Sequence, residues 1–141
     1  MVTPFTQRML IASANVRPAR ILAVSASAEE TAAEATGVTL PLVGVSVNAG
    51  KYPYGSFEYT AVPYTAETGD AISYRGPGQI AQVLSGAAIT ALGTPLTSDG
   101  SGRAITASTA ASYCIGFPLD TAAAADELIR VAITFPFKLG A

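Results

Sequence analysis

The stretch Thr97–Ser108, TSDGSGRAITAS, decides whether the chain is expected to bind phosphate or to turn between two strands. Glycine-rich loops bind phosphate where backbone N–H groups converge at the N-terminus of a helix. The residues after Gly102 are RAITAS, whose isoleucine and threonine favour a strand, and the Gly-Lys-Ser/Thr of a Walker loop is absent. Asp-Gly and Ser-Gly tolerate the positive φ angles of hairpin loops. We therefore predict the tip of a β-hairpin here, and not an anion site.

Short runs of β-branched and aromatic residues recur along the rest of the chain, with Gly and Pro at their edges. These runs are RILAVSAS (20–27), LPLVGVSV (40–47), SFEYTAV (56–62), AISYR (71–75), QIAQVL (79–84), SYCIGFPL (112–119) and ELIRVAITFPF (127–137). Short strands at this spacing are typical of sandwiches and barrels. We predict an all-β fold: a compact small β-sandwich, jelly roll or β-barrel with short strands and an extended N-terminal arm. The predicted organisation is an arm over residues 1–20 and a single β-domain over residues 21–141.

Two local patterns predict how the runs are connected. Gly76-Pro77-Gly78 lies between AISYR and QIAQVL, which predicts a hairpin that joins these two runs. In SAEETAAEA (27–35), Ser27 and Glu30 have the spacing of a helix capping box. A helix this short is marginal on its own, so we expect a helical turn or a loop there.

Composition argues against most kinds of chemistry. The 141 residues include no histidine, which is the commonest general base and a frequent metal ligand, and only one cysteine, Cys114. Asp120, Asp126 and Glu127 lie close in sequence, but they lack the alternate oxygen ligands and the turn glycine of a calcium loop. We therefore expect no enzymatic activity, no catalytic residues, no metal and no cofactor.

Charge and hydropathy limit the possible partners. The formal net charge is −2, which is not the basic footprint of a nucleic-acid-binding protein. No apolar stretch approaches the roughly 20 residues that span a bilayer, and the N-terminus does not have the pattern of a signal peptide. We expect no direct nucleic-acid partner and no membrane partner.

A protein partner is expected instead. Charged residues make up only 13% of the chain, against about 25% in ordinary soluble domains, so part of the surface is expected to be covered. Arginine and aromatic residues are enriched in interfaces. The candidate contact residues of the arm are Phe5, Arg8, Arg17 and Arg20, and those of the Tyr-rich segment are Tyr52, Tyr54, Phe57, Tyr59 and Tyr64.

The sequence also contains a weak internal echo. When residues 24–47 are laid on residues 96–119 without gaps, Ala32 meets Ala104, Ala35 meets Ala107 and Gly44 meets Gly116. We interpret the echo as a hint that two similar β-units build the core.

Several pieces of the sequence, taken in order, resemble the capsid cement, or decoration, proteins of tailed bacteriophages. The pieces are Val16-Arg17-Pro18, Gly69-Asp70, the Tyr74–Gly78 turn, Leu96–Gly100 with Gly102–Ala104, Ile115-Gly116 and Leu128–Val131. The resemblance implies a structural virion protein on the outer surface of the head, bound to the phage major capsid protein as a homotrimer at three-fold and quasi-three-fold junctions. On such a shell we expect the arm residues above to contact the capsid and the Tyr-rich residues to lie at a subunit or capsid interface, although the Tyr-rich segment is the part of the chain that resembles the family least. The family has no catalytic residues to transfer to this chain.

Two other functions remain as alternatives. A carbohydrate-binding or adhesive β-domain would use the Tyr-rich segment as a stacking platform. A small hydrolase would need a pocket with perturbed carboxylates, and the sequence offers no obvious pair.

Overall fold

The computed structural model describes residues 10–25, 30–47 and 65–140, and in these ranges the regular structure consists of β-strands. The strands are β1 (Ile11–Ala12), β2 (Ile21–Val24), β3 (Thr31–Glu34), β4 (Leu42–Ser46), β5 (Tyr74–Arg75), β6 (Ile80–Leu84), β7 (Leu96–Ser98), β8 (Ala104–Thr106), β9 (Tyr113–Pro118) and β10 (Leu128–Lys138). The all-β prediction is confirmed. No helix in the described ranges has the length and apolar character needed to cross a bilayer.

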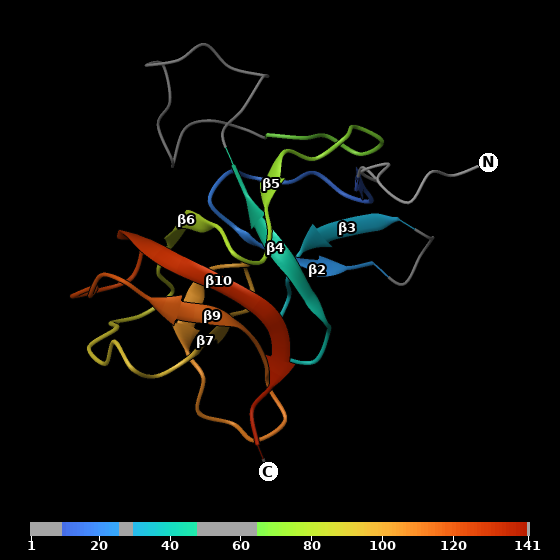
Figure 1. The fold of residues 1–141 in the computed structure, drawn as a ribbon. Coiled ribbons are helices and arrows are strands. Elements are labelled where there is room, and N and C mark those ends of the chain that lie inside the picture. The colour runs from blue at the N-terminus through green and yellow to red at the C-terminus, as the bar shows by residue number, and fades with distance from the viewer. Residues whose placement is uncertain (1–9, 26–29, 48–64, 141) are drawn as a thin grey trace.

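The strands form two five-stranded sheets (Figure 1). The first sheet has the order β1-β3-β2-β4-β5, and the second has the order β6-β10-β9-β7-β8. All neighbouring strands are antiparallel except β1 and β3, which run parallel. Strand β4 contacts β6, β9 and β10, so it lies where the first sheet meets the second.

The two sheets contain the same four-strand arrangement. In the first sheet the hairpin β2–β3 is followed by β4, which pairs with β2, and by β5, which pairs with β4. In the second sheet the hairpin β7–β8 is followed by β9, which pairs with β7, and by β10, which pairs with β9. This correspondence confirms that two similar β-units build the core, as the sequence echo indicated.

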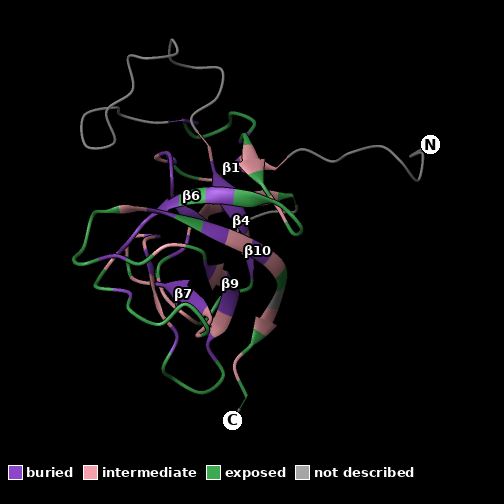
Figure 2. Ribbon diagram, turned by 60° about the vertical axis from the view of Figure 1, so that its left-hand side comes forward, coloured by how far each residue is buried: buried purple, intermediate pink, exposed green. Residues whose placement is uncertain are grey.

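The main core lies between the two sheets. Alternation along each strand sends one set of side chains inward, because successive residues of a strand point to opposite faces. The largest fully buried side chains of this core are Ile21, Leu42, Val45, Val83, Ile89, Leu96, Ile115, Ile129 and Val131. Figure 2 shows that β4 and β9 are mostly buried, whereas β10 becomes more exposed toward its C-terminal end.

A second, smaller core covers the opposite face of the first sheet. Leu22 points into it from β2, and Val16, Ala66 and Ile72 cover that side chain from segments outside the sheet. Because β1 and Val16 belong to this packing, residues 10–20 form part of the domain, although we expected them to lie in an arm. Residues 1–9 lie outside the described residues, so the arm itself stays a prediction.

Two glycines allow strands to approach closely at equivalent places in the two units. A Cβ atom on Gly44 would lie 2.3 Å from the carbonyl oxygen of Arg75, on the neighbouring strand β5. A Cβ atom on Gly116 would lie 2.0 Å from the carbonyl oxygen of Ala132, on the neighbouring strand β10. Both distances are far below van der Waals contact distance. Close strand packing therefore explains why both equivalent positions of the sequence echo hold glycine.

The hairpin predicted around Thr97–Ser108 is confirmed. Strands β7 and β8 pair antiparallel, with Leu96 opposite Thr106 and Ser98 opposite Ala104. Gly102 has a φ of 75°, which is the left-handed conformation that glycine adopts most easily.

Two other local predictions are wrong. Gly76–Gln79 does form a turn, with Gly78 at a φ of 85°, but β5 joins the first sheet and β6 joins the second, so no hairpin forms. Thr31–Glu34 forms strand β3 instead of a helical turn or loop. Pairing with β2 and burial of Ala32 outweigh the helix propensity of this alanine- and glutamate-rich run. Ser27, the expected cap, lies outside the described residues.

Candidate functional site

The loop between β7 and β8 is fixed internally by one carboxylate. Oδ1 of Asp99 accepts hydrogen bonds from the backbone N–H groups of Ser101 and Arg103, at 2.8 and 2.9 Å. Oδ2 of Asp99 accepts a hydrogen bond from Nε of Arg103 at 2.9 Å. Asp99 therefore closes the loop and positions the Arg103 side chain with the same carboxylate.

The same loop packs against the first sheet. The backbone N–H of Ile21, at the start of β2, donates to the carbonyl oxygen of Gly102 at 2.7 Å. Oγ of Ser98 donates to the carbonyl oxygen of Ala35 at 3.4 Å. A Cβ atom on Gly102 would lie 3.2 Å from the carbonyl oxygen of Ile21 and 3.3 Å from Cβ of Arg20. The β7–β8 loop therefore contacts the first sheet next to Arg20 and Ile21, and we call this contact region between the two sheets the joint.

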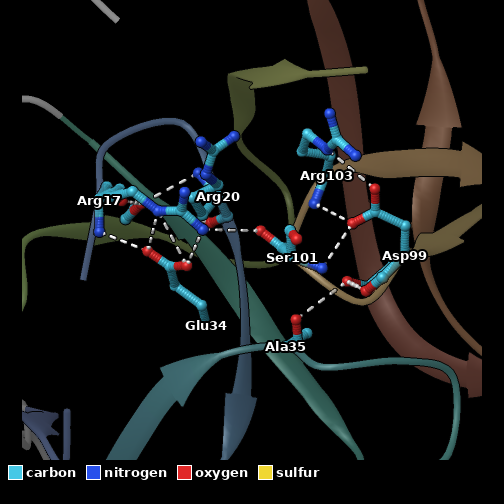
Figure 3. Close-up of polar contacts among 9 residues, drawn as sticks. Arg17, Arg20, Glu34, Ala35, Asp99, Ser101 and Arg103 are labelled. Carbon is cyan, nitrogen blue, oxygen red and sulfur yellow. Dashed lines mark hydrogen bonds and ion pairs between the residues drawn. The ribbon is translucent and has the colours of Figure 1, made fainter. Parts of the chain in front are cut away.

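Three arginines surround this joint, and two of them have carboxylate partners (Figure 3). Arg17 makes a two-pronged contact with Glu34, in which Nη2 lies 2.7 Å from Oε1 and Nε lies 3.0 Å from Oε2. The backbone N–H of Arg17 donates to Oε2 of the same carboxylate at 2.6 Å. Two parallel N–H···O bonds give strength and orientation, so Glu34 is fully engaged by Arg17.

Arg103 is held from two sides. Its Nε contacts Asp99, and its Nη1 donates to Oδ1 of Asp126 at 3.0 Å. The hydrogen bond to Asp126 and the charge of Asp99 raise the pKa of Arg103 above its ordinary value. Asp126 has a φ of 64°, an uncommon conformation for a residue other than glycine, and it lies just before β10.

Arg20 is different from the other two. Its residue is only 6% exposed, and within the described part of the chain its Nε and Nη1 atoms are buried without a hydrogen-bond partner. Burial lowers the pKa of Arg20, and the nearby charge of Arg17 lowers it further. In Figure 3 the guanidinium points away from Glu34. The backbone around it is well anchored, because the N–H of Arg20 donates to Oγ of Ser46 and its carbonyl accepts from the N–H of Ser46.

The structure places two of the nine sequence-predicted contact residues. Arg17 and Arg20 are brought together at the joint, and the side chain of Arg17 is 40% exposed. Phe5, Arg8, Tyr52, Tyr54, Phe57, Tyr59 and Tyr64 lie outside the described residues, so their roles stay predictions. Sequence reasoning missed Glu34, Asp99 and Arg103 as members of the cluster. For Asp99 the sequence did contain a signal, which is the Asp99-Gly100 turn. Aspartate is favoured in turns because its side chain can accept a hydrogen bond from the backbone two residues further along the chain.

Other carboxylates are engaged separately. Asp120 accepts three hydrogen bonds from Arg130, one from the backbone N–H and two from the guanidinium. Glu127 accepts a hydrogen bond from the N–H of Ala124. No group of three or more metal-ligating side chains is present among residues 10–25, 30–47 and 65–140. The arrangement at the joint suits charge recognition and structural fixation, because its acids are committed to arginines.

Two large apolar side chains lie exposed on the second sheet. Phe135 of β10 is 82% exposed and follows Ile133, where the pairing of β10 with β9 changes register. Ile80 of the edge strand β6 is 53% exposed and lies opposite Ala132 of β10. Exposed apolar side chains on an edge strand and at a bulge are available for contact with another molecule.

Comparison with known proteins gives an informative structural likeness. No family model matches the chain, and no curated protein sequence matches it. The fold is similar to the crystal structure of the head fiber gp8.5 N base of bacteriophage phi29, with a TM-score of 0.56 and 21% sequence identity. The match covers 94% of this chain and 96% of that chain. At this identity the likeness establishes a shared fold over nearly the whole length of both chains.

Proposed function

We propose that this protein is a structural component of a phage virion, located on the outer surface of the head. The observation that carries the proposal is the shared fold with a protein named as the base of a phage head fibre. The sequence resemblance to capsid cement proteins supports the same location from independent features. The composition agrees, since the chain has no histidine and its described carboxylates at the joint are committed to arginines.

In this role the protein acts mechanically, as a cement or decoration protein that binds the major capsid protein. Packaged DNA pushes the shell outward, and a clamp that contacts several capsomers raises the free energy needed to separate them. We propose a homotrimer at three-fold and quasi-three-fold junctions. Linked subunits gain avidity, because the second and third contacts form at high effective concentration.

Contact with the shell is proposed for the N-terminal residues and the Tyr-rich segment. Phe5 and Arg8 remain the candidates of the arm, and Arg17 has an exposed side chain that a partner can reach. Arg20 also remains a candidate, but it is only 6% exposed, so an acidic group of the shell would have to reach into the joint to contact it.

The test uses purified heads that lack the protein. The protein should cosediment with these heads, and the decorated heads should retain DNA to a higher temperature than undecorated heads in a fluorescence release assay. Analytical ultracentrifugation of the free protein should give three times the 14.3 kDa chain mass. Failure to bind heads would remove the virion role, whereas a monomer that still binds would remove only the trimer.

The structural likeness favours a second, related candidate, which is a base that anchors a head fibre. The two candidates share the location but differ in what stands on the bound domain. Electron cryomicroscopy of decorated heads separates them, because a cement protein bridges neighbouring capsomers, whereas a fibre base supports a projecting density.

A further inference from the structure

Two of the three guanidinium nitrogens of Arg20 lack an acceptor within the described part of the chain. Nε and Nη1 are both buried and unpartnered. Nearby Glu34 is occupied by three N–H groups of Arg17, and Asp99 and Asp126 are occupied by Arg103. If one of these carboxylates paired with Arg20 instead, Arg17 or Arg103 would lose a hydrogen-bonding partner.

Arginine cannot avoid this cost by losing its proton. A buried lysine or carboxyl group can become neutral, but an arginine in a protein stays charged at any ordinary pH. An isolated charge away from water is unfavourable by far more than a neutral polar group, and buried charges are therefore paired. The charges of Arg17 and Arg103 act unfavourably on Arg20, and those of Glu34 and Asp126 act favourably, but both of these acids are hydrogen-bonded to the other two arginines.

We propose that the Arg20 guanidinium binds an oxyanion at the joint between the two sheets. The ligand chemistry is that of a carboxylate, phosphate or sulfate group, which accepts N–H bonds from arginine with good geometry. The group can come from a free inorganic ion or from a carboxylate of a bound partner. The latter source rests on the proposed function, whereas the former does not.

Binding at this place should hold the two sheets together. Arg20 directly precedes β2, and the N–H of the next residue, Ile21, donates to the β7–β8 loop of the second sheet. An anion on Arg20 adds an acceptor next to that contact in the folded state, and a ligand that binds only the folded state raises its stability by mass action.

The experiment measures the melting temperature of the full chain in increasing sodium phosphate, sodium sulfate or sodium acetate, each matched in ionic strength with sodium chloride. Phosphate and sulfate stabilise many proteins by exclusion from the surface, and that effect rises without saturation. We expect in addition a saturable rise of about 3 °C or more at millimolar concentration with at least one oxyanion. A response that never saturates, or that chloride reproduces, would overturn binding of a free oxyanion.

Two variants locate the site. R20Q should lose the saturable rise, and R75Q, which changes an exposed arginine of β5, should keep it. An equal saturable rise in R20Q would show that the anion binds elsewhere and would overturn the proposal. If R20Q does not fold, R20K is used instead, since it keeps the charge, and it should shift the half-saturation point to higher concentration; an unchanged half-saturation point would overturn the assignment to Arg20.

A competition experiment with phosphate distinguishes the two possible sources of the oxyanion, which are a free ion and a carboxylate of the head. If a carboxylate of the head occupies the site, millimolar phosphate should weaken cosedimentation of both the wild-type protein and R75Q with heads. The R20Q variant should bind heads more weakly than the wild type, and phosphate should not weaken its binding further. If phosphate stabilises the free protein and leaves head binding unchanged, the ligand is the free ion. If no free oxyanion stabilises the protein and head binding is the same for wild type and R20Q, the proposal fails for both sources, while the proposed virion role stands.

Discussion

Gly44 and Gly116 set how closely two strands approach in each sheet. In both cases the added Cβ of an alanine would meet a backbone carbonyl, which cannot move aside as a side-chain end can. Sequence alone showed that the two glycines are equivalent in the internal echo, but it did not show why. The close approach depends on which strand lies opposite, and that information is absent from local sequence.

The first prediction follows from this packing. G116A should lower the free energy of unfolding by about 3 kcal/mol, because overpacking against a fixed backbone forces the strands apart. Urea unfolding followed by fluorescence measures the change. G93A is the control, since a Cβ atom on Gly93 meets nothing within 4 Å, and it should be within about 0.5 kcal/mol of wild type. Equal stability of the two variants would contradict the close approach.

The second prediction concerns Asp120, whose pKa is lowered to about 2 by its hydrogen bonds to Arg130. A lowered folded-state pKa means that the pair contributes to stability above the ordinary pKa of aspartate, near 3.8, and that this contribution disappears as the pH falls toward about 2. NMR titration of the carboxyl carbon should give the low value in the wild type. In R130Q the titration should move back toward the ordinary value, and an unchanged midpoint would show that Arg130 is not the cause.

At the scale of elements, the β7–β8 hairpin works as a joint rather than as a free tip. Its loop is closed by Asp99 and fixed to the first sheet through Gly102. Arg103, which a hairpin-tip interpretation would leave as a free surface charge, instead links Asp99 to Asp126. The loop therefore couples the two sheets.

The third prediction tests this coupling. D99A removes the acceptor of two backbone N–H groups and of Arg103, so it should lower the free energy of unfolding by about 2 kcal/mol. Urea unfolding measures it. D120A, which also removes an arginine-paired aspartate but at an exposed position, is the matched control and should have a smaller effect. If D120A destabilises as much as D99A, the loop is not a joint.

The sequence predicted those elements whose signals are local. The hairpin around Asp99-Gly100 was predictable because both its turn and its pairing lie within twelve residues of chain. The turn at Gly76–Gln79 was also predictable, but the separation of β5 and β6 into different sheets was not, because turn residues specify a bend and not the partners of the flanking strands. Strand β3 was missed because its partners override the helix propensity of its residues. Arg17 and Arg20 were singled out as possible contacts, but their cluster with Asp99 and Arg103 depends on long-range folding.

At the scale of the whole molecule, the fourth prediction separates the domain from its proposed anchor. Removal of residues 1–9 should leave a folded protein, because the ten described strands begin at Ile11 and residues 10–140 supply an extensive set of buried side chains to both cores. The melting temperature should change by less than about 3 °C, in keeping with a loss below about 1 kcal/mol. Binding to heads should fall at least tenfold in a cosedimentation titration, since Phe5 and Arg8 are removed.

The control for this truncation is R75Q, a charge change on a folded strand far from residues 1–9 in sequence. It should bind heads as the wild type does. Truncated protein that decorates heads with unchanged affinity would show that the first nine residues do not anchor the domain.

Strand β10 has a consequence for how the protein is made. It is the last of the ten described strands along the chain, yet it lies between β6 and β9 and pairs with both of them. During translation, β6 and β9 are therefore synthesised before the strand that pairs with both of them. The edges that face β10 stay unpaired until Leu128–Lys138 has left the ribosome. The second sheet can be completed only after β10 has been synthesised. A nascent chain therefore cannot present the finished second sheet to any partner before β10 has emerged.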